Sequence, residues 1–365
     1  MEFIRVEDCC EILDSQRKPI TESERVPGRY PYYGANGIQG TINQYIFDGK
    51  LVLVAEDGGH FGSKTKSIAY LVNGKCWVNN HAHVLRAKKG FLAEYICYSL
   101  MFYKIEGYIN GATRQKLTQA ALRKLIIPKR SVEYQKAIVD RLDLVRYIIE
   151  KKQNIINELD LLIKSRFVEL FGDVVLNTLN WPLVKLSDIA EYRIGLTYKP
   201  EAVSSSGIAV LRSGNIQNSQ LCYEDTIYVN SKVESKLLLK KHDILMCARN
   251  GSQSLVGKVA LIENDISNTT YGAFMMAISS KYYVYLFEYF RSQAFRRLIS
   301  VGSTTTINQV TTRMLNSIVI PLPDMDTINR FALYHSQINK LKSDVQKSID
   351  ETQLLMDSLM QEYFG

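Results

Sequence analysis

One stretch of this sequence recurs as a diverged second copy, in which the spacing is kept but many residues differ. The first copy, LIIPKRSVEYQKAIVDRLDLVRYIIEKKQNIINELDLLIKSRFVELFG, spans residues 125–172, and the second, IVIPLPDMDTINRFALYHSQINKLKSDVQKSIDETQLLMDSLMQEYFG, spans residues 318–365. The prolines Pro128 and Pro321 lie 193 residues apart, and so do the final glycines, so the two copies align without a gap. A repeat of this length indicates that the whole chain is built from two similar halves.

Each copy has the apolar spacing of one long helix. Apolar residues recur at alternating steps of three and four, a period of 3.5 that predicts the narrow seam of a coiled coil. The predicted seam consists of Ile138, Leu142, Val145, Ile149, Ile156, Leu159 and Ile163 in the first copy and Phe331, Ile338, Val345, Ile349, Met356 and Leu359 in the second. Ser131 and Asp324 are suited to cap the two N-termini. So narrow a seam needs a partner, and we expect the two helices to pair with each other, although two helices of an ordinary bundle also fit.

The composition is that of a globular protein with two or three domains. Of its 365 residues, 46% are hydrophobic and 22% are charged. The net charge of +8 fits a polyanionic partner, but also a merely basic protein. The six cysteines lack zinc-site spacing and are expected to be reduced thiols in the cytoplasm. The chain opens without a signal-peptide pattern, and no apolar run approaches the ~18 residues that span a membrane, so we expect no membrane association.

The repeat divides the chain into four parts. The predicted boundaries are 1–130 for a first globular domain, 131–172 for a helix, 173–323 for a second globular domain and 324–365 for a second helix. Both globular domains have short apolar runs between turn-forming residues, which is typical of mixed, largely antiparallel sheets. The run at 51–55 and its counterpart at 244–248 are again 193 residues apart, and helices are expected at 91–103 and 282–299. The framework residues repeat while the loop residues differ. This is suited to a protein that recognises two different targets with one duplicated scaffold.

Motifs for catalysis or cofactor binding are weak. An adenine methyltransferase needs an Asn/Asp-Pro-Pro-aromatic motif, and the sequence contains no Pro-Pro. The stretch 58–65 fails the spacing of a phosphate-binding loop. His81 and His83 are predicted on one face of a strand, but no third ligand is evident, so no metal is expected. We therefore expect the isolated chain not to be an enzyme and to bind no cofactor.

Side chains suited to contact DNA collect in matching loops of both domains. Arginine pairs with guanine, asparagine and glutamine pair with adenine, and lysine mostly contacts phosphate. The candidates in the first domain are Tyr33, Asn36, Gln39, His60, Lys64, Lys66, Asn80, His81, Arg114, Gln115 and Lys116. The candidates in the second domain are Arg212, Asn215, Gln217, Arg249, Asn250, Ser252, Gln253, Lys258, Tyr271, Thr305, Thr306 and Asn308.

Taken together, these features resemble the specificity (S) subunit of type I restriction-modification systems. The resemblance covers nearly the whole chain, and its most specific parts are the two Ile-Pro junctions that lead into helices ending in Phe-Gly. Also typical are LRSGNI at 211–216 and DILMCARNG at 243–251. The resemblance implies an α+β fold in which two α/β target-recognition domains are separated by two long helices, paired as an antiparallel coiled coil with an internal pseudo-twofold repeat.

The resemblance also implies a function and partners. Each domain would read one half of a bipartite, gapped target in double-stranded DNA, and the coil would set the spacing between the halves. The coil would dock two methyltransferase (M) subunits, which carry S-adenosylmethionine and methylate adenine. Two restriction (R) subunits, using ATP and magnesium, would complete the nuclease. A coiled-coil adaptor and a stand-alone DNA-binding regulator remain alternatives.

One position departs from the repeat. The first domain has Glu56 where the second has Arg249. A carboxylate does not suit a phosphate contact, but it could accept a hydrogen bond from the amino group of a cytosine.

Overall fold

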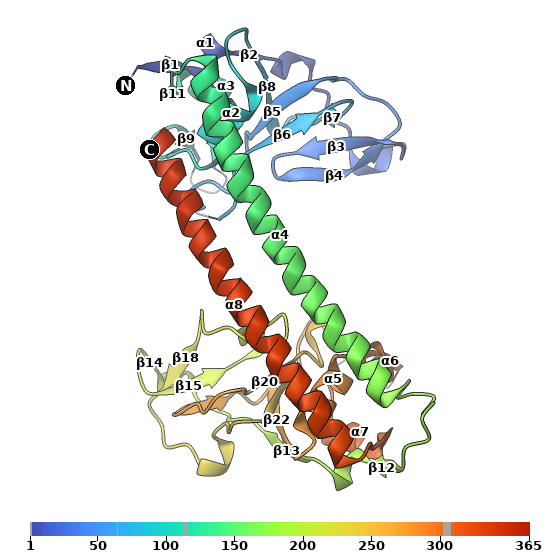
Figure 1. The fold of residues 1–365 in the computed structure, drawn as a ribbon. Coiled ribbons are helices and arrows are strands. Elements are labelled where there is room, and N and C mark those ends of the chain that lie inside the picture. The colour runs from blue at the N-terminus through green and yellow to red at the C-terminus, as the bar shows by residue number, and fades with distance from the viewer. Residues whose placement is uncertain (1, 64, 112–114, 302–307) are drawn as a thin grey trace. The chain divides into compact units, whose positions relative to one another are not determined.

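The computed structural model describes residues 2–63, 65–111, 115–301 and 308–365. It contains two compact units, each described here by itself (Figure 1). Unit 1 consists of Met1–Asn154 together with Gln346–Gly365, and unit 2 consists of Ile155–Val345. Each unit therefore contains one globular domain and a segment of both long helices, α4 (Val132–Phe171) and α8 (Met325–Phe364).

Among its described residues, unit 1 contains two larger sheets and two pairs of short strands. The four-stranded antiparallel sheet has the order β2 (Cys10–Ile12), β8 (Ala82–Ala87), β5 (Lys50–Ala55), β6 (Ala69–Asn73). The second sheet has the order β4 (Gly37–Ile42), β3 (Tyr30–Gly34), β7 (Trp77–Val78), with β3 and β7 parallel. β1 (Phe3–Arg5) pairs with β11 (Ile126–Pro128), and β9 (Ile109–Asn110) with β10 (Lys116–Leu117). The helices of the domain are α1 (Val6–Cys9), α2 (Ala93–Met101) and α3 (Gln119–Lys124).

Unit 2 repeats this plan. Its four-stranded antiparallel sheet has the order β13 (Glu191–Ile194), β22 (Met275–Ser279), β19 (Ile244–Cys247), β20 (Val259–Leu261). The second sheet has the order β14 (Val203–Ser204), β18 (Ile227–Val229), β15 (Ile208–Leu211), β21 (Thr269–Tyr271), with β15 and β21 parallel. β12 (Leu183–Lys185) pairs with β23 (Val319–Pro321), and β16 (Ile216–Gln217) with β17 (Gln220–Leu221). The helices of the domain are α5 (Tyr283–Arg291), α6 (Gln293–Val301) and α7 (Thr312–Ser317).

The expected single helix at 282–299 is wrong in one respect, because the structure divides it into α5 and α6. Ser292 separates them in an extended conformation, with ψ of 155°. Its hydroxyl accepts a hydrogen bond from the Phe295 amide and donates one to the Tyr289 carbonyl. A serine that caps a new helix in this way ends the preceding one.

The helix termini are held by the residues predicted for them. The Ser131 hydroxyl accepts the amide of Tyr134 at 3.3 Å, and the Asp324 carboxylate accepts the amide of Thr327 at 2.7 Å. Gly172 follows α4 with φ of +72°, the left-handed conformation of a helix C-cap that glycine adopts without strain.

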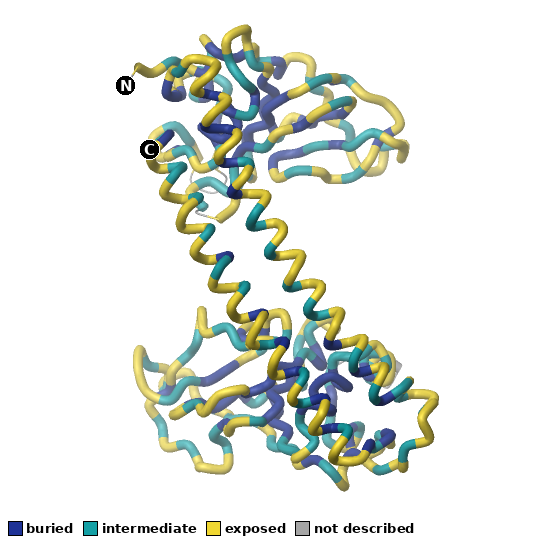
Figure 2. Tube along the Cα trace, viewed as in Figure 1, coloured by how far each residue is buried: buried dark blue, intermediate teal, exposed yellow. Residues whose placement is uncertain are grey.

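Within each unit the segments of α4 and α8 run antiparallel. In unit 1, Arg141 donates to the Tyr363 hydroxyl at 3.0 Å and Lys152 donates to the Thr352 hydroxyl at 2.7 Å. In unit 2, Lys342 contacts Asp160 at 2.7 Å. Partner numbers on α8 fall as numbers on α4 rise, which defines the antiparallel direction. Every predicted seam residue is buried or half-buried, as the burial pattern along each helix shows (Figure 2).

The phenylalanine that ends each long helix packs against the core of a unit. In unit 2, the Phe171 ring lies 5.0 Å from the ring of Tyr285, and in unit 1 the Phe364 ring lies 5.4 Å from that of Tyr95. Each tyrosine hydroxyl also donates to the carbonyl of the strand-ending proline, at 2.5 Å in unit 2 and 2.8 Å in unit 1. The repeated motif therefore ties a long helix, a domain helix and a short strand together.

Among the described residues, no helix combines the length and apolar character needed to cross a membrane.

Candidate nucleic-acid interface

In unit 1, several loops meet where strand β5 ends. The amide of Leu117 donates to the Glu56 carbonyl at 2.8 Å, which brings strand β10 to this point. The Asn36 side chain, from the turn between β3 and β4, donates to the Gly58 carbonyl at 2.9 Å. Three segments that are far apart in the sequence therefore form one loop cluster.

Unit 2 forms the equivalent cluster where strand β19 ends. The amide of Val310 donates to the Ala248 carbonyl at 2.7 Å. The Asn250 side chain donates to the Ser213 hydroxyl at 3.0 Å and so connects the loop that follows β15. The Asn308 side chain donates to the Gly251 carbonyl at 3.2 Å. Equivalent segments therefore meet in both units, although the side chains differ and the hydrogen bond from Val310 ends one residue before the position equivalent to Glu56.

One pair of positions is joined in both clusters. In unit 1, Lys116 lies 2.9 Å from the Glu56 carboxylate. In unit 2, Arg249 donates to the side-chain oxygen of Gln309 at 2.7 Å. Each member lies 193 residues from its counterpart. The residue at the end of the strand is thus an acid in one unit and a base in the other.

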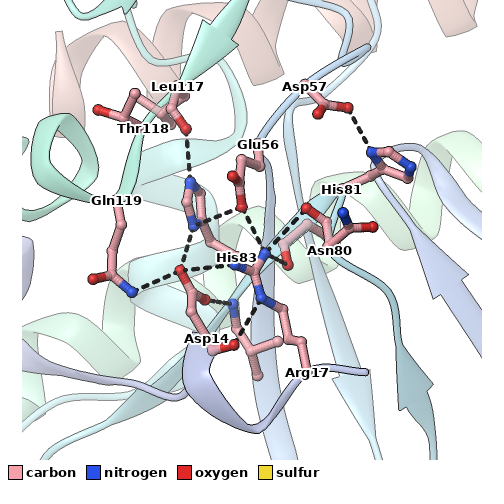
Figure 3. A network of polar contacts seen from close by, with 12 residues as sticks. Asp14, Arg17, Glu56, Asp57, Asn80, His81, His83, Leu117, Thr118 and Gln119 are labelled. Carbon is pink, nitrogen blue, oxygen red and sulfur yellow. Dashed lines mark hydrogen bonds and ion pairs between the residues drawn. The ribbon is translucent and has the colours of Figure 1, made fainter. Parts of the chain in front are cut away.

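Glu56 lies in a network of charged groups inside unit 1 (Figure 3). It is only 9% exposed, and the Arg17 guanidinium donates to it at 2.6 Å. Burial by itself raises the pKa of Glu56, but hydrogen bonds from Arg17 and Lys116 and the nearby His83 outweigh burial and hold that pKa below its usual value. The suggestion that Glu56 reads a cytosine is therefore corrected: its carboxylate is engaged by cations of its own domain.

The same network explains the two histidines. His83 is fully buried and contacts Asp14 at 2.6 Å and the Leu117 carbonyl at 2.8 Å, whereas His81 contacts Asp57 at 2.7 Å. Asp14, Glu56 and His83 bring potential metal ligands within 4.8 Å of one another. The Arg17 guanidinium lies among these carboxylates, 2.6 Å from Glu56 and 3.5 Å from Asp14 (Figure 3). Arg17 therefore supplies the positive charge that balances the carboxylates of Asp14 and Glu56.

In unit 2, the loop cluster borders a hollow of about 640 Å³. Its lining includes Tyr198, Arg212, Arg249, Asn250 and Phe274. Phe274 is 60% exposed, so its ring is accessible from solvent. Positive charge, an amide and aromatic rings around one hollow are the groups that contact phosphates and bases.

Most of the predicted DNA-contacting residues are exposed or half-exposed. These are Tyr33, Asn36, Gln39, His60, Lys66, Asn80, His81, Gln115, Lys116, Arg212, Gln217, Arg249, Asn250, Ser252, Gln253, Lys258 and Asn308. The structure brings Asn36 and Lys116 to the loop cluster of unit 1, and Arg249, Asn250 and Asn308 to that of unit 2. Gln217 and Lys258 do not line the hollow.

Two predicted contacts are corrected by burial. Asn215 is 3% exposed; its side chain accepts the Arg212 amide at 2.8 Å and donates to the Cys222 carbonyl at 2.9 Å. Tyr271 is fully buried and its hydroxyl donates to the Arg193 carbonyl at 3.2 Å. Both residues stabilise the fold around the hollow. The predictions for Lys64, Arg114, Thr305 and Thr306 lie outside the described residues.

Sequence reasoning missed Phe274 and Gln309. Gln309 ends the polar loop that had supplied other candidates, but its partner Arg249 is distant in sequence. Phe274 follows the Gly-Ala turn at 272–273, and an aromatic residue after such a turn was the only available signal.

The comparisons with known proteins agree with this duplicated architecture. The family model described as the type I restriction modification DNA specificity domain matches residues 1–161 and again residues 179–355. The chain belongs to this family, that of the specificity subunits of type I restriction-modification systems. The predicted family and fold are therefore confirmed.

Individual relatives extend the same match. A Haemophilus influenzae protein described as a type I restriction enzyme specificity subunit is 27% identical, over 73% of this chain and 69% of its own length. The MjaVIII specificity subunit of Methanocaldococcus jannaschii is 20% identical, over 98% of this chain and 91% of its length. The crystal structure of a type I S subunit from M. genitalium has a TM-score of 0.58 at 14% identity, covering 100% of this chain and 96% of that one.

Proposed function

We propose that each globular domain of this specificity subunit reads one half of a bipartite, gapped DNA target. The observation that carries the proposal is the matched pair of loop clusters, which lie at equivalent strand ends but carry different side chains. At one point Glu56 and Lys116 stand where the second domain has Arg249 and Gln309. The first domain closes this pair within itself, whereas the second leaves Arg249 exposed. The two clusters therefore present different groups to DNA, which favours different bases.

The paired helices set the spacing between the half-sites and dock two methyltransferase subunits. Two leucine pairs at repeat-equivalent positions support this proposal. Leu161 and Leu162 are 59% and 48% exposed, and Leu354 and Leu355 are 69% and 51% exposed. Exposed leucines on a helix are suited to an apolar interface. Since the same pair recurs once per repeat, two copies of one partner could each bind one pair.

The chemistry belongs to the partners in this proposal. The methyltransferase subunits carry S-adenosylmethionine and methylate adenine, and restriction subunits with ATP and magnesium perform cleavage. This chain contributes recognition and assembly, binds none of these cofactors and has no catalytic role.

Methylation mapping tests the proposal. The chain is co-expressed with the methyltransferase encoded beside it, and N6-methyladenine is mapped with and without the chain. A gapped, two-part motif that requires both proteins is expected. Exchanging residues 173–323 for those of a relative should change one half of the motif only. The same motif without this chain, or no motif, would favour an adaptor role for the coil.

A further inference from the structure

Arg249 is held along one edge of its guanidinium. Its Nε and Nη2 both donate to the side-chain oxygen of Gln309, at 3.2 and 2.7 Å. These two nitrogens form the side edge of the planar group. The end edge, made by Nη1 and the second hydrogen of Nη2, has no hydrogen-bond partner among the described residues. One oxygen therefore fixes the plane and leaves two nearly parallel N–H groups available.

The aromatic ring of Phe274 lies beneath the same guanidinium. The centre of the Phe274 ring lies 5.7 Å from the guanidinium carbon. The backbone of this phenylalanine is fixed, because its carbonyl accepts the amides of Ala248 and Arg249 at 2.9 and 3.0 Å. Two supports from different segments restrict the rotamers of an exposed arginine, so less conformational entropy is lost when it binds.

We propose that Gln309 and Phe274 position Arg249 to read a guanine in the half-site contacted by the second domain. The end edge of a guanidinium matches the O6 and N7 acceptors of guanine in the major groove. A phosphate can be bound by the same edge, but such a contact carries no base preference, and base preference is what the experiment measures. This inference rests on the proposed function, and it assigns Arg249 as the base-contacting residue and Gln309 as a positioning residue.

The first domain does not repeat this arrangement. Its strand-end residue is Glu56, whose carboxylate is bound by Arg17 and Lys116. The guanine contact is therefore specific to one half-site, and Lys116 provides a matched control at the position equivalent to Gln309. Lys116→Leu should leave the guanine position unchanged.

The test uses the assembled S and M subunits and measures methylation rates on synthetic duplexes. The duplexes carry the mapped wild-type motif with one guanine at a time replaced by 7-deazaguanine, which lacks N7. One guanine, in the half changed by exchanging residues 173–323, should be sensitive in the wild-type complex. Replacing that guanine by adenine should lower kcat/KM by roughly 5- to 150-fold. In Arg249→Ala, 7-deazaguanine and adenine at this position should have little further effect.

Variants of Gln309 separate positioning from folding. Gln309→Leu removes the acceptor and should weaken discrimination at the same guanine, whereas Gln309→Glu keeps an acceptor and should retain it. A wild-type motif in which no guanine responds to Arg249→Ala would overturn the inference and leave the proposed function intact. Equal weakening at every position, with a smaller salt dependence, would also overturn it by showing a phosphate contact. No bipartite motif in the wild type would refute the proposed function and the inference together.

Discussion

The two loop clusters use the same backbone in opposite ways. In unit 1, Glu56 is 9% exposed and is enclosed by Arg17 and Lys116. In unit 2, Arg249 is exposed, held on one edge by Gln309 and open on the other. One position thus serves stability in the first unit and, in our proposal, recognition in the second. A duplicated scaffold can thus keep a polar pair buried within one copy and leave the equivalent pair accessible to a ligand in the other.

In contrast to the loop clusters, the contacts that attach the ends of the long helices to the domains are the same in both units. Tyr95 and Tyr285 each contact a helix-ending phenylalanine and a proline carbonyl. The two contacts nevertheless differ in burial: Phe171 is fully buried, while Phe364 is half-buried.

The largest expected effect tests whether the two anchors are equivalent. Phe171→Ala should destabilise unit 2 by about 3–5 kcal/mol, because it leaves a cavity in a fully packed aromatic cluster. Phe364→Ala should cost unit 1 about 1–2 kcal/mol, because the side chain is already partly solvated. Denaturant unfolding followed by hydrogen exchange in each unit measures both values. Equal losses would show that the difference in burial has no energetic consequence.

The next largest effect tests the two strand-end residues. Glu56→Gln should destabilise unit 1 by about 3 kcal/mol, because it leaves Arg17 without a full countercharge in a buried network. Arg249→Ala should change the stability of unit 2 by no more than about 0.5 kcal/mol, since the side chain is exposed. Unit-resolved unfolding midpoints check this pair. A large stability loss in Arg249→Ala would mean that this arginine supports the fold.

The pH dependence of unit 1 sharpens the same comparison. Burial alone would raise the pKa of Asp14, but hydrogen bonds from His83 and Gln119 bring it below its usual value, as described for Glu56. Because the folded-state pKa values are lowered, the ionised carboxylates stabilise unit 1 above their unfolded pKa values of about 4. That contribution is lost as the pH falls through the folded-state values. Unfolding measured from about pH 6 to pH 3 should therefore show a shallower acid loss in Glu56→Gln than in the wild type.

The smallest expected effects concern two lysines in the helix seam. Lys342→Met should cost about 1 kcal/mol, because among the described residues Asp160 would keep Arg291, at 3.8 Å, as its one ionic partner. Lys152→Met should be neutral within about 0.5 kcal/mol, because the partners of Lys152 in the described part of the chain are neutral oxygens, the Ser348 carbonyl and the Thr352 hydroxyl. Thermal unfolding of both variants measures the difference. Adding Asp160→Asn to Lys342→Met should recover part of the loss, and its failure to do so would locate the cost in packing.

The sequence predicted the features that depend on local spacing. The seam follows from periodicity, and the caps at Ser131 and Asp324 follow from short-range side-chain hydrogen bonds. It could not predict features that depend on tertiary contacts. Glu56 looked available until the fold brought Arg17 against it, and Asn215 looked like a reader until its loop enclosed it. The positions of exposed loop residues relative to bases depend on such contacts as well.

The division of the chain into units has a consequence for synthesis. All of unit 2 is one continuous segment, Ile155–Val345, whereas unit 1 needs Gln346–Gly365, which is translated after it. Tyr363 is buried in the core of unit 1 beside residues such as Leu142. Domains usually complete folding in the order in which they leave the ribosome. Here the order is reversed, because unit 1 begins first in the sequence but is completed last. Until Gln346–Gly365 has been synthesised, the core residues of unit 1 that pack against this segment lack their contact with it.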